Sequence, residues 1–412
     1  MATAGAPGAA RASVIVRGTD AGIARAAVEA AGGKVTQDLW IVNGVAAEVP
    51  VAALEALRSQ PGIVEVGNDD PVQIQAANPS PVHPPTAVYP KVVGADDLWA
   101  EGIDGEGVAV AVIDTGVKPV ADLAGRVVGG VDLSGENGSD IEDGNPYDDG
   151  FGHGTFVAGL IAGNGASSNG AYKGVAPNAK IVPVKIAGRN GAADISHLLA
   201  GIQWVVSFKD TYNIRAVNIS LGTNSATPYY LSTVNAAVEK AWDSGLVVIV
   251  SAGNMGTGAE TVQKPGDDPL VITAGAVDDR GTETRNDDVM AGFSGAGPTK
   301  ADGLSKPDLV ASGRSVIGLR VPGSKIDAAY PGSRVGSAYF KGSGTSFSAA
   351  VTSGSVALLL DREPGLTPDQ VKARLLGTAA AGPVGNPNVD GHGSLDAYAA
   401  AHAGTFDSAN QG

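Results

Sequence analysis

The feature that most constrains the fold of this chain is a series of short apolar runs that are continuous rather than alternating. They are VAVAVID (108–114), KIVPVKIAG (180–188), AVNISLG (216–222), LVVIVSAGN (246–254) and LVITAGAVD (270–278). Continuous apolar runs are typical of parallel strands that helices cover on both faces. Helical stretches separate the runs, so the sequence predicts an α/β fold with a mainly parallel central sheet.

Polar residues at the ends of these runs are the first candidates for function. Each run closes in Gly, Asp, Asn or Ser. The carboxyl ends of parallel strands meet at one edge of a sheet, and ligands and catalytic groups gather there. Asp114, Asn254 and the residues around Ser220 are therefore the first candidates for chemistry.

The first part of the chain predicts a separate small α+β unit. From Ala12 to about Ile74 the expected order is β-α-β-β-α-β, with helices at Ala21–Ala31 and VAALEALRSQ. The next stretch, QAANPSPVHPPTAVYP, is rich in proline and has no apolar period, which predicts an extended linker. On composition alone, the unit is also compatible with a small domain used for binding.

Charge and composition exclude several classes of protein. Lys and Arg number 28 against 43 Asp and Glu, a formal net charge of −15, which argues against nucleic acid or an anionic membrane as partner. Cysteine is absent, so disulfides, thiolate zinc sites and a cysteine nucleophile are excluded. The longest apolar runs are far shorter than the ~20 residues that cross a bilayer.

Three residues that are far apart in the sequence suggest nucleophilic catalysis. Asp114 closes an apolar run, His153 lies where GFGHGTFVAG turns into a helical pattern, and Ser346 opens the small-residue helix of GTSFSAA. Taken singly, they are compatible with a turn aspartate, a structural histidine and a cap serine. Their order along the chain, Asp then His then Ser, is one of the known orders of a serine-hydrolase triad.

These segments resemble the active-site motifs of the subtilase family. The motifs are VAVIDTGV, GHGTFVAG and GTSFSAA, and AGN at 252–254 resembles the family's oxyanion motif. The resemblance spans roughly Gly94 to Ala380. It implies a subtilisin-like three-layer αβα fold in which Ser346 is the nucleophile, His153 the base, Asp114 its partner and Asn254 an oxyanion donor.

The resemblance also gives a meaning to the N-terminal unit. It implies a ferredoxin-like propeptide over residues 1–76, a linker and mature N-terminal segment over 77–93, and a catalytic domain over 94–412. Such propeptides assist folding and then inhibit the enzyme, so the chain would be a zymogen. The segment DDPVQIQA (69–76) would be the inhibitory tail, with self-cleavage near Ile74 to Ala77.

Substrate contacts follow from the resemblance as well. Ser220-Leu221-Gly222 and Gly191-Ala192-Ala193 resemble the two segments that pair with an extended peptide, so peptide would bind by strand addition. Met255, directly after Asn254, replaces a polar or acidic residue of well-known subtilisins. It implies an apolar or broad preference at the primary pocket.

Calcium is the metal that the resemblance implies. Asp122 stands where many subtilases supply a calcium ligand, with the loop GNGASSNGAYKG (163–174) as the source of further oxygen ligands. The acidic run SDIEDGNPYDDG (139–150) is a second candidate, or a solvated surface. No HExxH motif occurs and the remaining histidines are scattered, so a zinc hydrolase has no support.

We expect a monomeric, secreted protease that acts on polypeptides and binds neither nucleic acid nor membrane. The start MATAGAPGAARAS lacks the features of a secretory signal, but a propeptide of this type favours export. A cytoplasmic protease is the alternative for location. For function, a catalytically silent peptide-binding relative is the alternative, whereas an α/β-hydrolase esterase would need a Gly-x-Ser-x-Gly motif that the sequence lacks.

Overall fold

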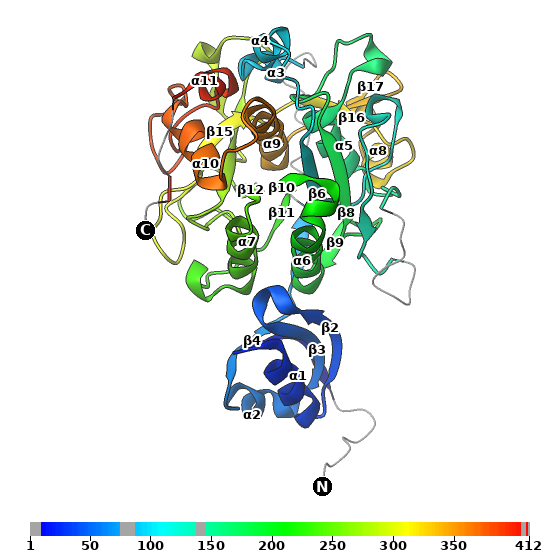
Figure 1. Ribbon diagram of the computed structural model, residues 1–412, viewed down its shortest axis with the longest axis vertical. Coiled ribbons are helices and arrows are strands. Elements are labelled where there is room, and N and C mark those ends of the chain that lie inside the picture. The colour runs from blue at the N-terminus through cyan, green and yellow to red at the C-terminus, as the bar shows by residue number, and fades with distance from the viewer. Residues whose placement is uncertain (1–9, 75–86, 137–145, 405–408, 411–412) are drawn as a thin grey trace.

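The computed structural model describes residues 10–74, 87–136, 146–404 and 409–410 (Figure 1). The five apolar runs form strands β6 (Ala109–Asp114), β8 (Lys180–Lys185), β10 (Ile214–Ile219), β12 (Val247–Ser251) and β13 (Ile272–Asp278). Within the described residues they are neighbours in an eight-stranded sheet of order β14-β13-β12-β10-β6-β8-β7, with β15 (Leu309–Ser312) also beside β13. All pairings among the five are parallel, so the predicted central sheet is confirmed.

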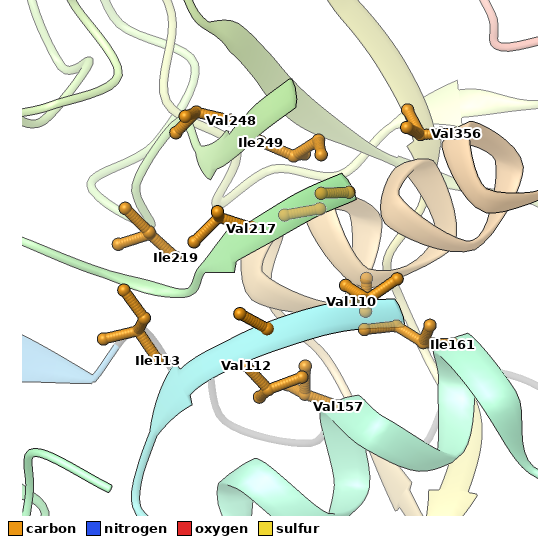
Figure 2. Packing of buried hydrophobic residues seen from close by; sticks show 14 of the residues in the cluster. Val110, Val112, Ile113, Val157, Ile161, Val217, Ile219, Val248, Ile249 and Val356 are labelled. Atoms are coloured by element: carbon orange, nitrogen blue, oxygen red, sulfur yellow. The ribbon is translucent and has the colours of Figure 1, made fainter. Parts of the chain in front are cut away.

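Two layers of helices enclose this sheet, as expected for a three-layer αβα fold. Helices α5 (His153–Ala162) and α9 (Thr345–Arg362) pack together on one face, and α6 (Ile195–Tyr212) and α7 (Thr233–Asp243) pack together on the other. Figure 2 shows valines and isoleucines of β6, β10 and β12 meeting those of α5 and α9. Both faces of the strands are therefore buried, which explains why their apolar runs are continuous.

Helix α9 is buried along nearly its whole length because its residues are small. The glycine at position 354 leaves no room for a side chain, since a Cβ there would lie 2.6 Å from the Cβ of Val175. The hydroxyls of Thr352, Ser353 and Ser355 donate to carbonyls one turn earlier, at 2.8 to 3.0 Å. These bonds satisfy polar groups that would otherwise be costly to bury.

The N-terminal unit forms an antiparallel sheet of order β2-β3-β1-β4. Its elements are β1 (Arg11–Gly18), α1 (Ala21–Ala30), β2 (Lys34–Leu39), β3 (Gly44–Pro50), α2 (Leu54–Arg58) and β4 (Ile63–Asn68). Val14, Val16, Ala24 and Val28 belong to its own apolar core, separate from that of the large unit. The blue unit in Figure 1 lies against α6 and α7.

Two small sheets and several short elements complete the fold. A small sheet of order β11-β5-β9 contains β5 (Pro71–Ile74), β9 (Ala192–Asp194) and β11 (Leu221–Gly222), and another of order β16-β18-β17 contains β16 (Val316–Leu319), β17 (Arg334–Val335) and β18 (Tyr339–Gly342). The remaining elements are β7 (Val131–Asp132), β14 (Val289–Met290), α3 (Tyr89–Val92), α4 (Ala95–Ala100), α8 (Lys325–Ala329), α10 (Pro368–Gly377) and α11 (Ala397–His402). No helix among the described residues combines the length and apolarity that a bilayer crossing requires.

Candidate active site

Asp114 and His153 form a buried pair at the carboxyl edge of the central sheet. Asp114 is the last residue of β6 and His153 is the first residue of α5, and both are fully buried. The imidazole Nδ1 lies 2.9 Å from each carboxylate oxygen of Asp114. The Thr115 N–H donates to Oδ1 of the same carboxylate at 2.8 Å. The carboxylate therefore fixes which imidazole nitrogen carries the proton, and leaves Nε2 to act as a base.

Ser346 is the second residue of α9 and lies close to this pair. Its hydroxyl donates to the carbonyl oxygen of Ser220 at 3.2 Å. The ring of the next residue, Phe347, stacks on the His153 imidazole with 5.6 Å between ring centroids. Nε2 of His153 is buried and has no hydrogen-bond partner among the described residues. The structure thus brings the serine helix beside the imidazole, with the serine hydroxyl turned toward Ser220.

Asn254 follows β12 and presents an amide donor beside the start of α9. Its Oδ1 accepts from the N–H of Thr345 at 2.9 Å and from the Thr345 hydroxyl at 3.0 Å. These two bonds fix the orientation of the amide. Nδ2 is buried and, within the part of the chain that is described, donates to no acceptor. A buried donor without an acceptor is costly, so its presence points to a group that arrives from outside.

The two predicted substrate segments lie on either side of a strand of this same chain. Strand β5 pairs antiparallel with β11, where Leu221 lies opposite Ile74, and with β9, where Ala193 lies opposite Val72. Gly222 and Ala192 belong to these two strands, and Ser220 and Gly191 directly precede them. The predicted segments therefore flank the extended strand β5 on its two sides, and the space between them is called the groove below.

Met255 and Gln263 lie near Asn254. Met255 is 59% exposed, and its predicted influence on substrate preference stays a prediction. Gln263 is 8% exposed, and its Oε1 has no hydrogen-bond partner among the described residues. A Cβ on Gly253 would lie 2.5 Å from that oxygen, and a Cβ on Gly222 would lie 3.5 Å from the Cβ of Gln263. The sequence does not indicate that Gln263 lies near Asn254, because a single glutamine in a loop belongs to no recognisable pattern.

Asp122 does not fit the calcium ligand that was expected of it. The residue is 1% exposed, and its Oδ2 accepts the hydroxyl proton of Tyr339 while its Oδ1 accepts from the Ser167 N–H at 2.9 Å. Burial raises the pKa of Tyr339, so the phenol stays a donor. The carboxylate therefore closes the 163–174 loop through protein donors, and hydrogen bonds take the place assigned to an ion.

The second predicted metal segment gives no support for an ion either. Residues 139–145 of the acidic run lie outside the described residues. Asp149, near its end, is buried and accepts hydrogen bonds from Gly152, Thr155 and Thr115. Among the described residues, no group of three or more His, Cys, Asp or Glu side chains is arranged to hold a metal.

A mainly parallel sheet with a carboxylate, an imidazole and a serine at its carboxyl edge is the arrangement of a serine hydrolase. Comparison with known proteins narrows this class. The model of the Subtilase family matches residues 105–393. The chain belongs to the subtilase family of serine endopeptidases, and the resemblance seen in the sequence motifs is confirmed.

Individual relatives agree with this assignment. The chain is 40% identical over 300 residues to serine protease AprX of Bacillus subtilis (strain 168), covering 72% of this chain and 66% of AprX. It is 31% identical over 374 residues to subtilisin E of the same organism, covering 90% of this chain and 84% of subtilisin E. Fervidolysin of Fervidobacterium pennivorans, described as a keratinolytic enzyme related to subtilisin, superposes with a TM-score of 0.75 at 26% identity. That superposition covers 97% of this chain and 62% of fervidolysin.

Proposed function

We propose that this chain hydrolyses peptide bonds through an acyl-enzyme formed on Ser346. The Ser346 oxygen attacks the scissile carbonyl carbon while Nε2 of His153 takes the hydroxyl proton, and the imidazolium then passes this proton to the leaving amine. Asp114 accepts the Nδ1–H bond throughout and stabilises the charged ring. Water hydrolyses the acyl-enzyme by the same proton route, which regenerates the serine.

Asn254 is proposed to stabilise the negative oxygen that develops on the attacked carbonyl. Its Nδ2 is the buried donor that lacks an acceptor among the described residues, and Thr345 holds the amide in place. The backbone N–H of Ser346, in the first turn of α9, is the natural second donor. A tetrahedral oxyanion supplies the acceptor that the resting site lacks.

One observation supports the proposal most strongly: strand β5 of this chain lies extended between β9 and β11, where we expect a substrate to bind. It pairs with β11 on one side and β9 on the other through main-chain register, with Val72 1% exposed. Main-chain pairing reads an extended peptide before any side chain, which suits an endopeptidase. Polypeptides are therefore the proposed substrates.

The same observation supports an inhibitory role for the N-terminal unit. We propose that residues 1–76 act as folding aid and inhibitor, that 77–93 link them to the catalytic domain at 94–412, and that the chain is an exported zymogen and a monomer. Strand β5 ends at Ile74, the first residue of the expected cleavage region near Ile74 to Ala77, of which residues 75–77 lie outside the described residues. Calcium has no part in this proposal, since Asp122 does not fit.

The test is casein hydrolysis by the purified chain and by a Ser346→Ala variant, with the Asp148→Asn variant as a matched control. We expect hydrolysis by wild type and control, and none above background by Ser346→Ala. A fluorophosphonate probe should label the wild type at Ser346. A chain that binds casein but neither cuts it nor takes the label would instead be the catalytically silent peptide-binding protein.

A further inference from the structure

A buried carboxylate beside the proposed acid–base pair has no part in the chemistry described above. Asp149 lies four residues before His153 and is 1% exposed. Its Oδ1 accepts from the Thr115 hydroxyl at 2.8 Å and from the Gly152 N–H at 2.7 Å. Its Oδ2 accepts from the Thr155 N–H at 2.8 Å and from the Thr155 hydroxyl. Four donors thus converge on one carboxylate.

On one side, these bonds fix the first turn of the helix that carries the imidazole. The first N–H groups of a helix have no partner within the helix, and a capping side chain usually takes one of them. The cap residue of α5 is Gly152, at φ 100°, which has no side chain. Asp149 supplies the missing acceptor to residues 152 and 155, on either side of His153. An anion also suits the positive end of a helix.

On the other side, Thr115 connects Asp149 to the turn that follows Asp114. The Thr115 N–H donates to Asp114 Oδ1 at 2.8 Å, and its hydroxyl accepts from the Gly154 N–H at 3.0 Å. A hydroxyl has a single proton to donate. Its distance to Asp149, 2.8 Å, is shorter than its distance to Asp114, 3.2 Å, so Asp149 receives that proton.

The donors around Asp149 match an ionised carboxylate. The Thr155 hydroxyl already accepts from the Lys118 N–H at 2.9 Å, as the Thr115 hydroxyl does from Gly154, so both hydroxyls have their protons free for Asp149. Burial raises the pKa of Asp149, and the hydrogen bonds from Thr155, Gly152 and Thr115 oppose that rise. An amide in the same place would present two protons toward groups that already donate.

We propose that Asp149 is a positioning residue for the proposed reaction. It ties the turn after Asp114 to the first turn of α5, and so keeps Nδ1 of His153 within hydrogen-bond distance of the Asp114 carboxylate while the imidazole gains and loses its proton. Within the described part of the chain, the hydrogen bonds of Asp149 go to Thr115, Gly152 and Thr155, and none of them joins it to Ser346 or to β9 and β11. Its kinetic effect rests on the proposed function, whereas the geometry that it holds exists without any turnover.

The kinetic test compares Asp149→Asn with Asp148→Asn in the full chain after activation is complete. Asp148 is the half-buried neighbouring carboxylate, so the two variants lose the same charge from the same loop. For Asp149→Asn we expect kcat on a small peptide substrate to fall by about 10- to 100-fold, as for a modest displacement of a catalytic group. KM should stay within about twofold, because no substrate contact is removed, and Asp148→Asn should keep the wild-type kcat.

A spectroscopic test follows the hydrogen bond itself and needs no activity. The Nδ1 proton between His153 and Asp114 gives a low-field proton resonance, which we would record in full chains that also carry Ser346→Ala. Asp149→Asn should shift or broaden this resonance, and Asp148→Asn should leave it unchanged. If the wild type proved to have no peptidase activity, the proposed function would fail and this measurement would still decide the role of Asp149.

Two outcomes would overturn the proposal. In the first, Asp149→Asn melts at a lower temperature but keeps both the kcat and the resonance of the wild type, so that the residue only caps a helix. The second outcome comes from variants of Thr115, which test the same link if Asp149→Asn does not fold. Thr115→Val removes the linking hydroxyl and should lower kcat, while Thr115→Ser restores the hydroxyl and should recover most of the rate. Equal kcat in these two variants would end the proposal.

Discussion

At the residue scale, a buried carboxyl group without a hydrogen-bond partner opposes folding when it is charged. Asp288 is 7% exposed, and neither of its oxygens has a hydrogen-bond partner among the described residues. Burial raises the pKa of Asp288 to about 7, with the negative charges of Asp279 and Asp287 adding to the rise. The folded chain therefore binds this proton more tightly than the unfolded chain. Protonated Asp288 therefore contributes its full share of stability below pH about 4, and this contribution is lost as the pH rises through about 7.

A pH series on Asp288→Asn tests this contribution. At pH 8 we expect the variant to melt above the parent by about 2–6 °C, because it no longer buries a charge, and the difference should vanish near pH 4. Ser346→Ala would be present in all chains to prevent self-digestion. Asp210→Asn, at a side chain 92% exposed, is the control and should change nothing. A constant difference at all pH values would show that the charge of Asp288 is not the cause.

At the element scale, the 163–174 loop is held by the carboxylate of Asp122, which accepts from Ser167 in the loop and from Tyr339, 217 positions further along the chain. Tyr339, in β18, donates its single phenolic proton to Asp122, and its oxygen lies 2.9 Å from the Ser168 hydroxyl oxygen. The Tyr339→Phe substitution removes the phenolic hydroxyl and leaves the buried carboxylate of Asp122 without one of its donors. This loss should lower the free energy of unfolding by about 1–3 kcal/mol. We expect a melting temperature lower by about 2–10 °C, measured in the Ser346→Ala background.

The same variant helps to decide whether hydrogen bonds from the protein or a calcium ion hold the 163–174 loop at Asp122. A calcium chelator should leave the melting temperature of the parent unchanged, because the loop is closed by Tyr339 and Ser167. Tyr230→Phe, at a side chain 67% exposed, should behave as the parent. Should the chelator lower the melting temperature of the parent as far as Tyr339→Phe does, the calcium interpretation of Asp122 would be restored.

This loop also marks the limit of what the sequence predicts. The parallel strands and the segments around Asp114, His153 and Ser346 carry local signals, namely continuous apolar runs and short motifs, and the sheet follows from them. The contact between Asp122 and Tyr339 carries no such local signal, because the two residues are far apart in the sequence and no pattern near Asp122 indicates its partner. The orphan oxygen of Gln263 and the four donors of Asp149 are likewise set by tertiary contacts, which periodicity does not reveal.

At the scale of the whole molecule, the N-terminal unit contributes to the apolar core of the large one. Ile15, Leu39 and Ile41 pack into the large unit's core, together with Val72 of β5. Polar bonds support this contact. Ser196 N–H donates to Asp69 at 2.8 Å at the start of α6. The β5 pairing and this apolar contact therefore both hold the N-terminal unit on the large one.

Val72→Ser weakens that hold without changing the catalytic site. Losing most of a buried valine's burial energy, about 1–2 kcal/mol, should raise the fraction of open groove about tenfold. We expect a shorter lag before the full chain hydrolyses a peptide substrate, and a higher initial rate. Val64→Ser is the matched control, since Val64 is 60% exposed on β4. Equal lags in the two variants would mean that β5 does not control access to the groove, because only one of them loses a buried contact there.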